Sequence, residues 1–239
     1  MPGWHERTRD LQASGDLQVV GLIQEQHPDR CALFQQWHGM TWPVLVDSLN
    51  LLGVERVPYA VCLDEAGVVQ AINPDPGAFE AFMARPAVSG VAVEVEVPEP
   101  PTGTDVGARR RASDLGVLFH GALDGAIEGY RAALDLEPED ATTHFRLGVA
   151  MRMRFERDGR TADFTGAIGH WGRALDLDPN QYIWRRRIQQ YGPRLDKPYS
   201  FYDWVTEARA AIEARGETPV PLRVEPGGAE FAAPMRRGA

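Results

Sequence analysis

Residues 42–70 read WPVLVDSLNLLGVERVPYAVCLDEAGVVQ, and this stretch decides how the first part of the chain folds. It contains three short apolar runs, at residues 44–46, 59–63 and 68–69. An amphipathic half-turn lies at residues 49–52, and a turn lies at residues 64–67. Apolar runs of this length between turn residues predict strands, so the expected order is strand, helix and hairpin. Because proline cannot donate a hydrogen bond to a sheet, Pro58 should open the second strand rather than lie within it.

Four short motifs in this stretch follow a recognisable order. They are PVLVD, GV, VP and DEAGV, at residues 43–47, 53–54, 57–58 and 64–68. This order resembles the second half of a thioredoxin-like domain of the redoxin group, which includes TlpA-type thiol-disulfide oxidoreductases and peroxiredoxins. The resemblance implies an α/β thioredoxin-like domain over residues 1–97, with a cis Val57–Pro58 bond lying against the redox site. The cis form costs little at an X-Pro bond, and an ordinary trans proline at the start of a strand is the alternative.

The redox motif of that family is missing from this sequence. In the family a CPxC motif opens the first helix, whereas residues 1–4 read MPGW, with Met1 and Trp4 in the two cysteine positions. A dithiol needs a low-pKa thiolate with a resolving partner beside it, so the resemblance implies a redox-inactive or degenerate module. The central strand before that motif also lacks a counterpart. We expect either a rearranged sheet or, preferably, an N-terminally truncated domain whose true start lies upstream.

The two cysteines, Cys31 and Cys62, form no CxxC pair. Cys62 lies within an apolar run, which favours the role of a small buried hydrophobic residue. Cys31 lies in the first turn of a predicted helix that continues to Trp37. There the helix N-terminus and the charge of Arg30 would lower the pKa of the thiol. Cys31 is therefore the candidate catalytic residue, with an inert structural cysteine as the competing interpretation.

The composition is that of an ordinary globular protein, with 44% apolar residues and a formal net charge of −9 over 239 residues. This charge argues against general binding of nucleic acid or anionic membranes, which draws on clustered lysine and arginine. The arginine runs at residues 109–111 and 185–187 are expected to be solvated helix faces or salt-bridge donors. No apolar run approaches the roughly 18 residues of a membrane span, and no signal peptide is evident. We therefore predict a cytoplasmic protein.

After the hairpin, residues 78–84 predict a short helix. Residues 89–97 alternate valine with alanine and glutamate, which predicts a one-sided strand at a sheet edge. Residues 98–107 are rich in proline and glycine and predict an extended linker.

Beyond the linker, two segments repeat with a period of 41 residues. GAIEGYRAALDLEP begins at Gly125 and GAIGHWGRALDLDP begins at Gly166. The pattern resembles the second helix of a tetratricopeptide repeat (TPR), in which small residues allow close helix packing and a proline ends the helix. The repeat-defining residues are Ala126, Tyr130, Ala133 and Pro138, then Ala167, Trp171, Ala174 and Pro179, together with Leu147 and Gly148 in the intervening helix.

The repeat unit is longer than the 34 residues of a TPR. The excess lies at residues 155–165, between two helices, where the pair can lengthen without disturbing the packing surface. Residues 182–191 supply a further amphipathic helix that would cap the stack. We therefore assign the repeats to residues 108–191. Residues 192–239 form a C-terminal extension, with a last helix from residue 203 that is expected to pack on the repeats, and a frayed tail.

No catalytic motif stands out, and the histidines lack metal-ligand spacing, so neither a cofactor nor a metal is expected. Two functions remain. The first is a protein-binding scaffold that combines a redox-inactive thioredoxin-like module with TPRs, whose surface binds a protein or peptide partner. The second is a redoxin-type thiol-disulfide or peroxide oxidoreductase. Its catalytic cysteine or selenocysteine would lie upstream of the first residue, or would be Cys31.

Overall fold

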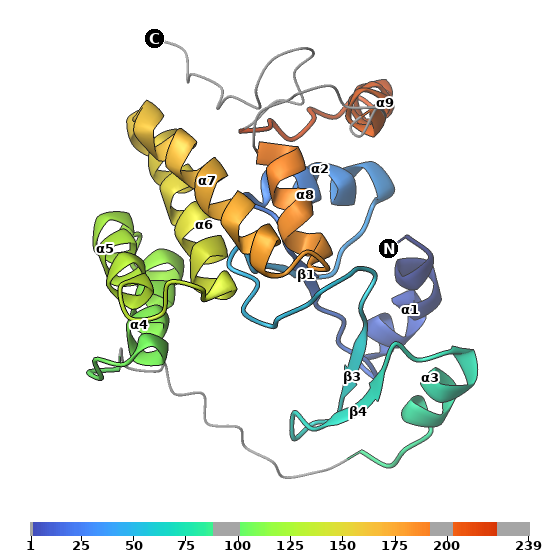
Figure 1. The fold of residues 1–239 in the computed structure, drawn as a ribbon. Helices are drawn as coiled ribbons and strands as arrows, with labels where there is room; N and C mark the ends of the chain where they lie inside the picture. The colour runs from blue at the N-terminus through green and yellow to red at the C-terminus, as the bar shows by residue number, and fades with distance from the viewer. Residues whose placement is uncertain (1, 88–100, 192–202, 224–239) are drawn as a thin grey trace.

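The structure, a computed structural model, describes residues 2–87, 101–191 and 203–223. A unit of short strands and helices built from residues 2–87, here called the N-terminal unit, lies beside a stack of helices built from residues 106–191, here called the helical stack (Figure 1). Within these described ranges, no helix is long and apolar enough to cross a membrane.

The described N-terminal unit contains three helices and four strands. They are α1 (Pro2–Ser14), β1 (Gly21–Ile23), α2 (Asp29–His38), β2 (Val44–Val46), β3 (Val61–Leu63), β4 (Val69–Ile72) and α3 (Pro76–Met83). β1 pairs with β2 in parallel, and the connection between them carries α2, since a parallel pair needs a long crossover. β3 pairs with β4 as an antiparallel hairpin. The two pairs form separate sheets, so this arrangement does not establish a thioredoxin fold.

The helix predicted at residues 49–52 is wrong, because turns occupy residues 47–54. The Asp47 carboxylate accepts hydrogen bonds from the backbone N–H groups of Leu51 at 2.8 Å and Leu52 at 3.3 Å. Asn50 has a φ of 52° and exchanges two side-chain hydrogen bonds of 3.0 Å with the backbone of Val54. Aspartate and asparagine side chains that bond nearby backbone groups in this way compete with helix formation.

The strands are shorter and more exposed than the sequence predicts. Only Val61–Leu63 of the apolar run at residues 59–63 form β3, and β1 has only three residues. Val61 and Leu63 are 42% and 52% exposed, so the hairpin lies on the surface rather than in the centre of a sheet. The strand predicted at residues 89–97 and the tail after residue 223 lie outside the described residues.

The helical stack contains five consecutive helices. They are α4 (Val106–Phe119), α5 (Leu123–Leu134), α6 (Ala141–Asp158), α7 (Thr161–Leu177) and α8 (Tyr182–Tyr191). Neighbours in sequence pack against each other, as expected for helical repeats, and α8, which packs on α7, lies beside the N-terminal unit (Figure 1). Asp105 and Asp140 begin α4 and α6, because each carboxylate accepts hydrogen bonds from backbone N–H groups of the first turn. The last two residues of the predicted linker therefore belong to α4.

Small residues mark the points where the helices approach most closely. A Cβ atom added at Gly148 would lie 2.5 Å from the ring of Trp171, and one at Gly166 would lie 2.2 Å from the Met151 Cε. Ala133 and Ala174 are completely buried. Larger side chains at these positions would therefore force the helices apart.

The excess length of the second unit lies where the sequence predicts it. α6 ends at Asp158 and α7 begins at Thr161, so both helices run further than a standard repeat helix would. Gly159, with a φ of 73°, ends α6 in the left-handed conformation that glycine adopts without strain.

A pair of histidines joins α6 to α7. The Nδ1 atoms of His144 and His170 lie 2.9 Å apart, and His144 Nε2 lies 2.9 Å from the carbonyl oxygen of Pro138. Since a carbonyl can only accept, this network assigns the His144 proton to Nε2, which leaves His144 Nδ1 to accept from His170. Burial, the neighbouring imidazole of His144 and the charge of Arg131 lower the pKa of His170 to about 4.

The last described helix, α9 (Asp203–Ala214), packs against α2 and not against the repeats, so the predicted placement is wrong. Leu33 of α2 is buried among Val205, Ala208, Ile212 and Leu222. The guanidinium of Arg215 donates to the carbonyls of Gln36 and Trp37, which satisfies the free end of α2. A long-range contact of this kind has no local signal in the sequence.

We predict that Ala174→Leu destabilises the protein by about 1–3 kcal/mol, because a buried small-residue position would be overpacked. The same change at Ala162, an exposed position on the same helix, should shift stability by less than about 0.5 kcal/mol. Urea unfolding followed by circular dichroism measures both. Equal shifts in the two variants would contradict the packing described above.

We also predict that stability falls as the pH is lowered from about 6.5 to about 4. Because the folded-state pKa of His170 lies below the ordinary value of 6.5, the unfolded chain binds more protons in this window. The contribution of His170 is therefore complete above pH 6.5 and declines toward pH 4. The urea midpoint of His170→Gln should depend less on pH over this window than the wild-type midpoint, and parallel curves would contradict the assignment.

Candidate functional site

The candidate site is the face of the helical stack that lies against the N-terminal unit, here called the inner face. It is formed by α6 and α8, with α4 beside α6. Three arginine side chains are buried on it: Arg146 and Arg152 on α6 and Arg187 on α8, which are 8%, 0% and 1% exposed. Buried arginines need several hydrogen-bond acceptors, so this face is built around polar recognition.

A turn of the N-terminal unit inserts into the inner face. This turn, residues 47–50, is here called the Leu49 turn. Leu49 is completely buried and belongs to the same apolar cluster as Phe145, Val149 and Trp184 of the helical stack. Asp47, Ser48 and Asn50 are each no more than 6% exposed. Leu49 therefore anchors the N-terminal unit in the core of the helical stack.

The arginines of the inner face bind the main chain of the N-terminal unit. Arg146 donates from Nε to the carbonyl oxygen of Leu49 at 3.1 Å. Arg187 donates from Nη2 to the carbonyl oxygens of Ser48 and Gln24, both at 3.0 Å. Hydrogen bonds to carbonyls fix the position of a segment without reading its side chains, as in the recognition of extended peptides.

A second set of buried contacts surrounds Gln26 and His27. Gln26 donates from Nε2 to the carbonyl oxygen of Val149 at 3.2 Å, and its Oε1 accepts from Arg187 at 2.6 Å. The Nε2 atom of His27 lies 2.5 Å from one oxygen of Glu156. Arg152 lies 2.6 Å from the other oxygen of the same carboxylate. Two separate loops of the N-terminal unit therefore meet the same face.

The first turn of α8 also uses the N-terminal unit. The backbone N–H of Tyr182, at the start of α8, donates to the carbonyl oxygen of Glu55 at 3.1 Å. The first N–H groups of a helix have no partner within the helix, so this bond satisfies one of them. The end of the helical stack is thus completed by a residue that lies far away in the sequence.

The Asp114 carboxylate of α4 holds the Arg146 side chain in place. Arg146 Nη1 lies 2.6 Å from Asp114 Oδ2, and Tyr130 donates its hydroxyl to Asp114 Oδ1 at 2.7 Å. Burial raises the pKa of the Asp114 carboxyl, and the charge of Arg146 and the bond from Tyr130 partly offset this rise. A repeat-defining aromatic residue, Tyr130, is therefore connected to the carbonyl of Leu49 through Asp114 and Arg146.

The redox candidates of the sequence lie elsewhere. Burial, with an added contribution from the charge of Glu25, raises the pKa of Cys31 to about 11, although Cys31 stands in the first turn of α2. Arg30, which the sequence suggests as a neighbouring charge, lies 3.9 Å from Glu25 through its guanidinium Nη1. The catalytic role of Cys31 stays a prediction. Cys62, whose pKa is also raised by burial, is a free thiol on β3.

The Val57–Pro58 bond, the candidate cis site, is cis in the structure. Both residues are exposed in the loop before β3 and take no part in the contacts with the inner face that are described above. The role of Pro58 beside a redox site stays a prediction.

The repeat-defining residues build the stack rather than a catalytic centre. Ala126, Tyr130, Ala133, Leu147, Gly148, Ala167, Trp171 and Ala174 are buried, whereas Pro138 and Pro179 lie exposed in the turns after α5 and α7. In the part of the chain that the structure describes, no group of three or more His, Cys, Asp or Glu side chains is placed to bind a metal ion.

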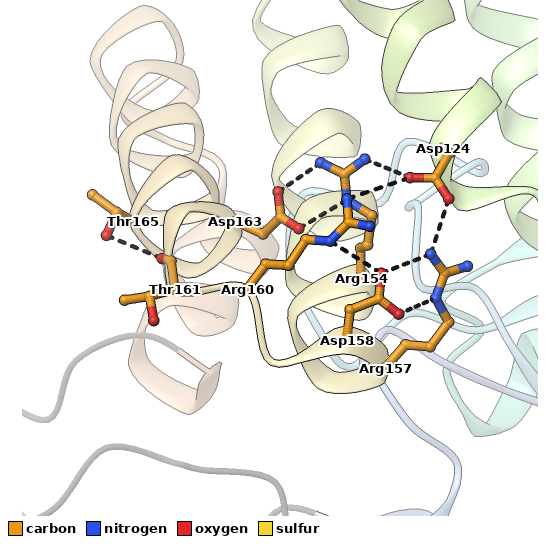
Figure 2. Close-up of polar contacts among 8 residues, drawn as sticks. All are labelled: Asp124, Arg154, Arg157, Asp158, Arg160, Thr161, Asp163 and Thr165. Carbon is orange, nitrogen blue, oxygen red and sulfur yellow. Dashed lines mark hydrogen bonds and ion pairs between the residues drawn. The ribbon is translucent and has the colours of Figure 1, made fainter.

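A second polar cluster lies at the lengthened ends of α6 and α7 (Figure 2). Arg154 lies 2.7 Å from Asp124 of α5 and 2.7 Å from Asp163 of α7, so it bridges three helices. Arg157 pairs with Asp124 and with Asp158. Hydrogen bonds from Arg154 and Arg157 lower the pKa of the Asp124 carboxyl, and the hydrogen bond from Arg157 lowers the pKa of the Asp158 carboxyl. The pair of Arg157 and Asp124 is exposed and stabilises the protein only modestly, whereas the side chains of Arg154 and Asp163 are largely buried. This cluster therefore supports the helix ends.

The sequence interpretation missed the buried arginines. The run at residues 185–187 was expected to be a solvated helix face or a salt-bridge donor, yet Arg187 is buried and binds carbonyl oxygens. Its spacing carries a signal that would have found it: Ile183, Trp184, Arg187 and Ile188 share one face of a helix, so Arg187 belongs to the apolar side. Leu49 gave no such signal, because it lies in a turn.

Comparison with known proteins supports the helical part of this description. The family model described as TPR repeat matches residues 120–152, which cover α5 and most of α6. No curated protein and no solved structure gave a match. The comparisons provide no support for a thioredoxin-like domain. The chain therefore contains a TPR repeat within a helical, TPR-like C-terminal region.

Proposed function

We propose that this protein is a protein-interaction scaffold whose helical stack holds the N-terminal unit on its inner face. TPRs commonly mediate protein–protein interaction, and their stacked helices form extended binding surfaces. One observation carries the proposal: Arg146 and Arg187 bind main-chain carbonyls of the Leu49 turn while its leucine fills the apolar core. The inner face thus already binds a peptide segment, supplied by the same chain.

The N-terminal unit is, in this proposal, a thioredoxin-like module without redox activity. The element order supports it, since a parallel pair with a crossover helix precedes a hairpin and a further helix. The raised pKa of Cys31 supports the absence of redox activity, because a protonated thiol is a poor nucleophile. The alternative, a redoxin-type oxidoreductase that uses Cys31, has less support for the same reason.

The scaffold proposal predicts that Arg187→Ala releases the N-terminal unit from the inner face. The buried carbonyl of Ser48 and the partly buried carbonyl of Gln24 would lose this donor, at a cost of about 1–3 kcal/mol for each buried group left unsatisfied. Hydrogen–deuterium exchange followed by mass spectrometry should therefore show faster uptake in peptides that cover residues 24–27 and 47–50. Uptake in α5 and α7 should change little.

Arg185→Ala is the matched control for that experiment. Arg185 lies on the same helix, but it is exposed and donates to the carbonyl of Pro179 in the preceding turn. Its replacement should leave uptake at residues 24–27 and 47–50 unchanged. If both variants gave the same uptake as the wild type, the inner face would not be what holds the N-terminal unit, and the scaffold proposal would fail.

The chain is also predicted not to reduce insulin disulfides. Reduction begins with attack by a thiolate and ends when a second thiol releases the mixed disulfide, and residues 1–5 supply neither. Turbidity should stay at the level of the uncatalysed reaction, with a thioredoxin as the positive control. Alkylation by iodoacetamide at neutral pH should be slow at Cys31 and should disappear there in Cys31→Ser. Sustained insulin reduction that persists in Cys31→Ser would contradict the redox-inactive assignment.

A further inference from the structure

We infer that the Leu49 turn is an internal ligand of the inner face, and that the inner face takes from a partner protein a turn of the same chemistry. That chemistry is a leucine side chain flanked by accessible main-chain carbonyls. The inference rests on the proposed scaffold function and deepens it, because it names the kind of segment that the scaffold binds and what competes with it.

The first argument is that the turn holds its own shape. Asp47 accepts hydrogen bonds from Leu51 and Leu52, and Asn50 closes a ring with Val54, all within residues 47–54. None of these bonds involves the helical stack. A segment that is ordered before it binds loses less conformational entropy on binding, which is the property of a good ligand.

The second argument is that the receptor is also formed in advance. Arg146 is oriented by Asp114, which in turn receives a hydrogen bond from Tyr130, and all three residues belong to the helical stack. Leu49 shares its apolar cluster with Phe145, Val149 and Trp184, which belong to the helical stack as well. These apolar residues and at least one donor for the Leu49 carbonyl therefore come from the helical stack and not from the turn.

The third argument concerns the chemical groups that the inner face recognises. Leu49 contributes a side chain, whereas Ser48 and Gln24 contribute carbonyl oxygens to Arg187. The donors are positively charged guanidinium groups, so a lysine or arginine in place of the leucine would add an unfavourable buried charge beside Arg146 and Arg187. A fitting partner segment is therefore a neutral or acidic turn with an aliphatic anchor.

The internal turn has a large advantage over any external segment. A ligand tethered to its receptor acts at an effective concentration on the order of millimolar, so it occupies the site unless the competitor is strong or abundant. The resting protein is consequently closed to such partners. Whatever loosens the Leu49 turn should open the inner face to them.

The test uses a fluorescent peptide of residues 43–55, PVLVDSLNLLGVE, and the full chain. Fluorescence anisotropy should show no saturable binding to the wild-type chain below about millimolar concentrations, because the internal turn occupies the site. The Leu49→Ala chain should bind the peptide with an apparent affinity at least about 30-fold higher, the lower end for loss of a buried leucine side chain from the competitor.

Two controls separate recognition from unfolding. The same peptide with alanine at the Leu49 position should not bind the Leu49→Ala chain, and adding Arg146→Ala to that chain should weaken binding of the original peptide. Equal binding of the two peptides, or no binding to a Leu49→Ala chain with wild-type helical circular dichroism, would overturn the inference. Loss of the helical signal in Leu49→Ala would overturn it too, because the turn would then be part of the core of the stack.

Failure of this inference can be distinguished from failure of the scaffold proposal. If Arg187→Ala speeds exchange at residues 24–27 but the peptide does not bind the Leu49→Ala chain, the helical stack holds the N-terminal unit permanently. The scaffold proposal would then stand, but the inference that a partner's turn can replace the Leu49 turn on the inner face would be wrong.

Discussion

The buried pair of Arg146 and Asp114 is the interaction on which the arrangement of this chain depends. Removing two charges from water is costly, and the attraction between them repays that cost only when the remaining donors are also satisfied. Here the guanidinium donates to Asp114 and to the carbonyl of Leu49, while Tyr130 donates to the carboxylate. One donor of this buried charge in the helical stack is thus satisfied by the N-terminal unit. This contact sets where the two parts of the chain meet.

The N-terminal unit in turn depends on its neighbours for stability. A two-stranded sheet is marginally stable alone, and this unit contains two that are not joined. It is held by the inner face through residues 24–27 and the Leu49 turn, and by α9 through Leu33 of α2. The described parts of the chain therefore form one body, in which a locally weak unit is fixed from two directions by helices that follow it in the sequence.

The helical stack could be predicted from the sequence because its signals are local. The spacing of Ala126, Tyr130, Ala133 and Pro138 and its repetition 41 residues later place α5 and α7, and the excess at residues 155–165 lengthens α6 and α7 as expected. The N-terminal unit was predicted less well, since side chains of Asp47 and Asn50 override an amphipathic pattern. The burial of Arg187 could have been predicted, because Arg187 lies on the apolar face of its helix. The site itself joins Leu49 to Arg146 across 97 residues, and no periodicity reports such a contact.

The lengthened second unit has a consequence for how this array could grow. α6 has 18 residues and α5 has 12, a difference of six, so α6 is longer by about 9 Å at 1.5 Å per residue. Arg154 and Arg157, in the part of α6 that extends beyond α5, form ion pairs with Asp124 at the start of α5. A duplicated copy of the long unit, placed before α6, would set a helix of 17 residues where the helix of 12 residues now lies. Gene duplication, the usual route to longer arrays, would therefore meet a mismatch in helix length at this junction.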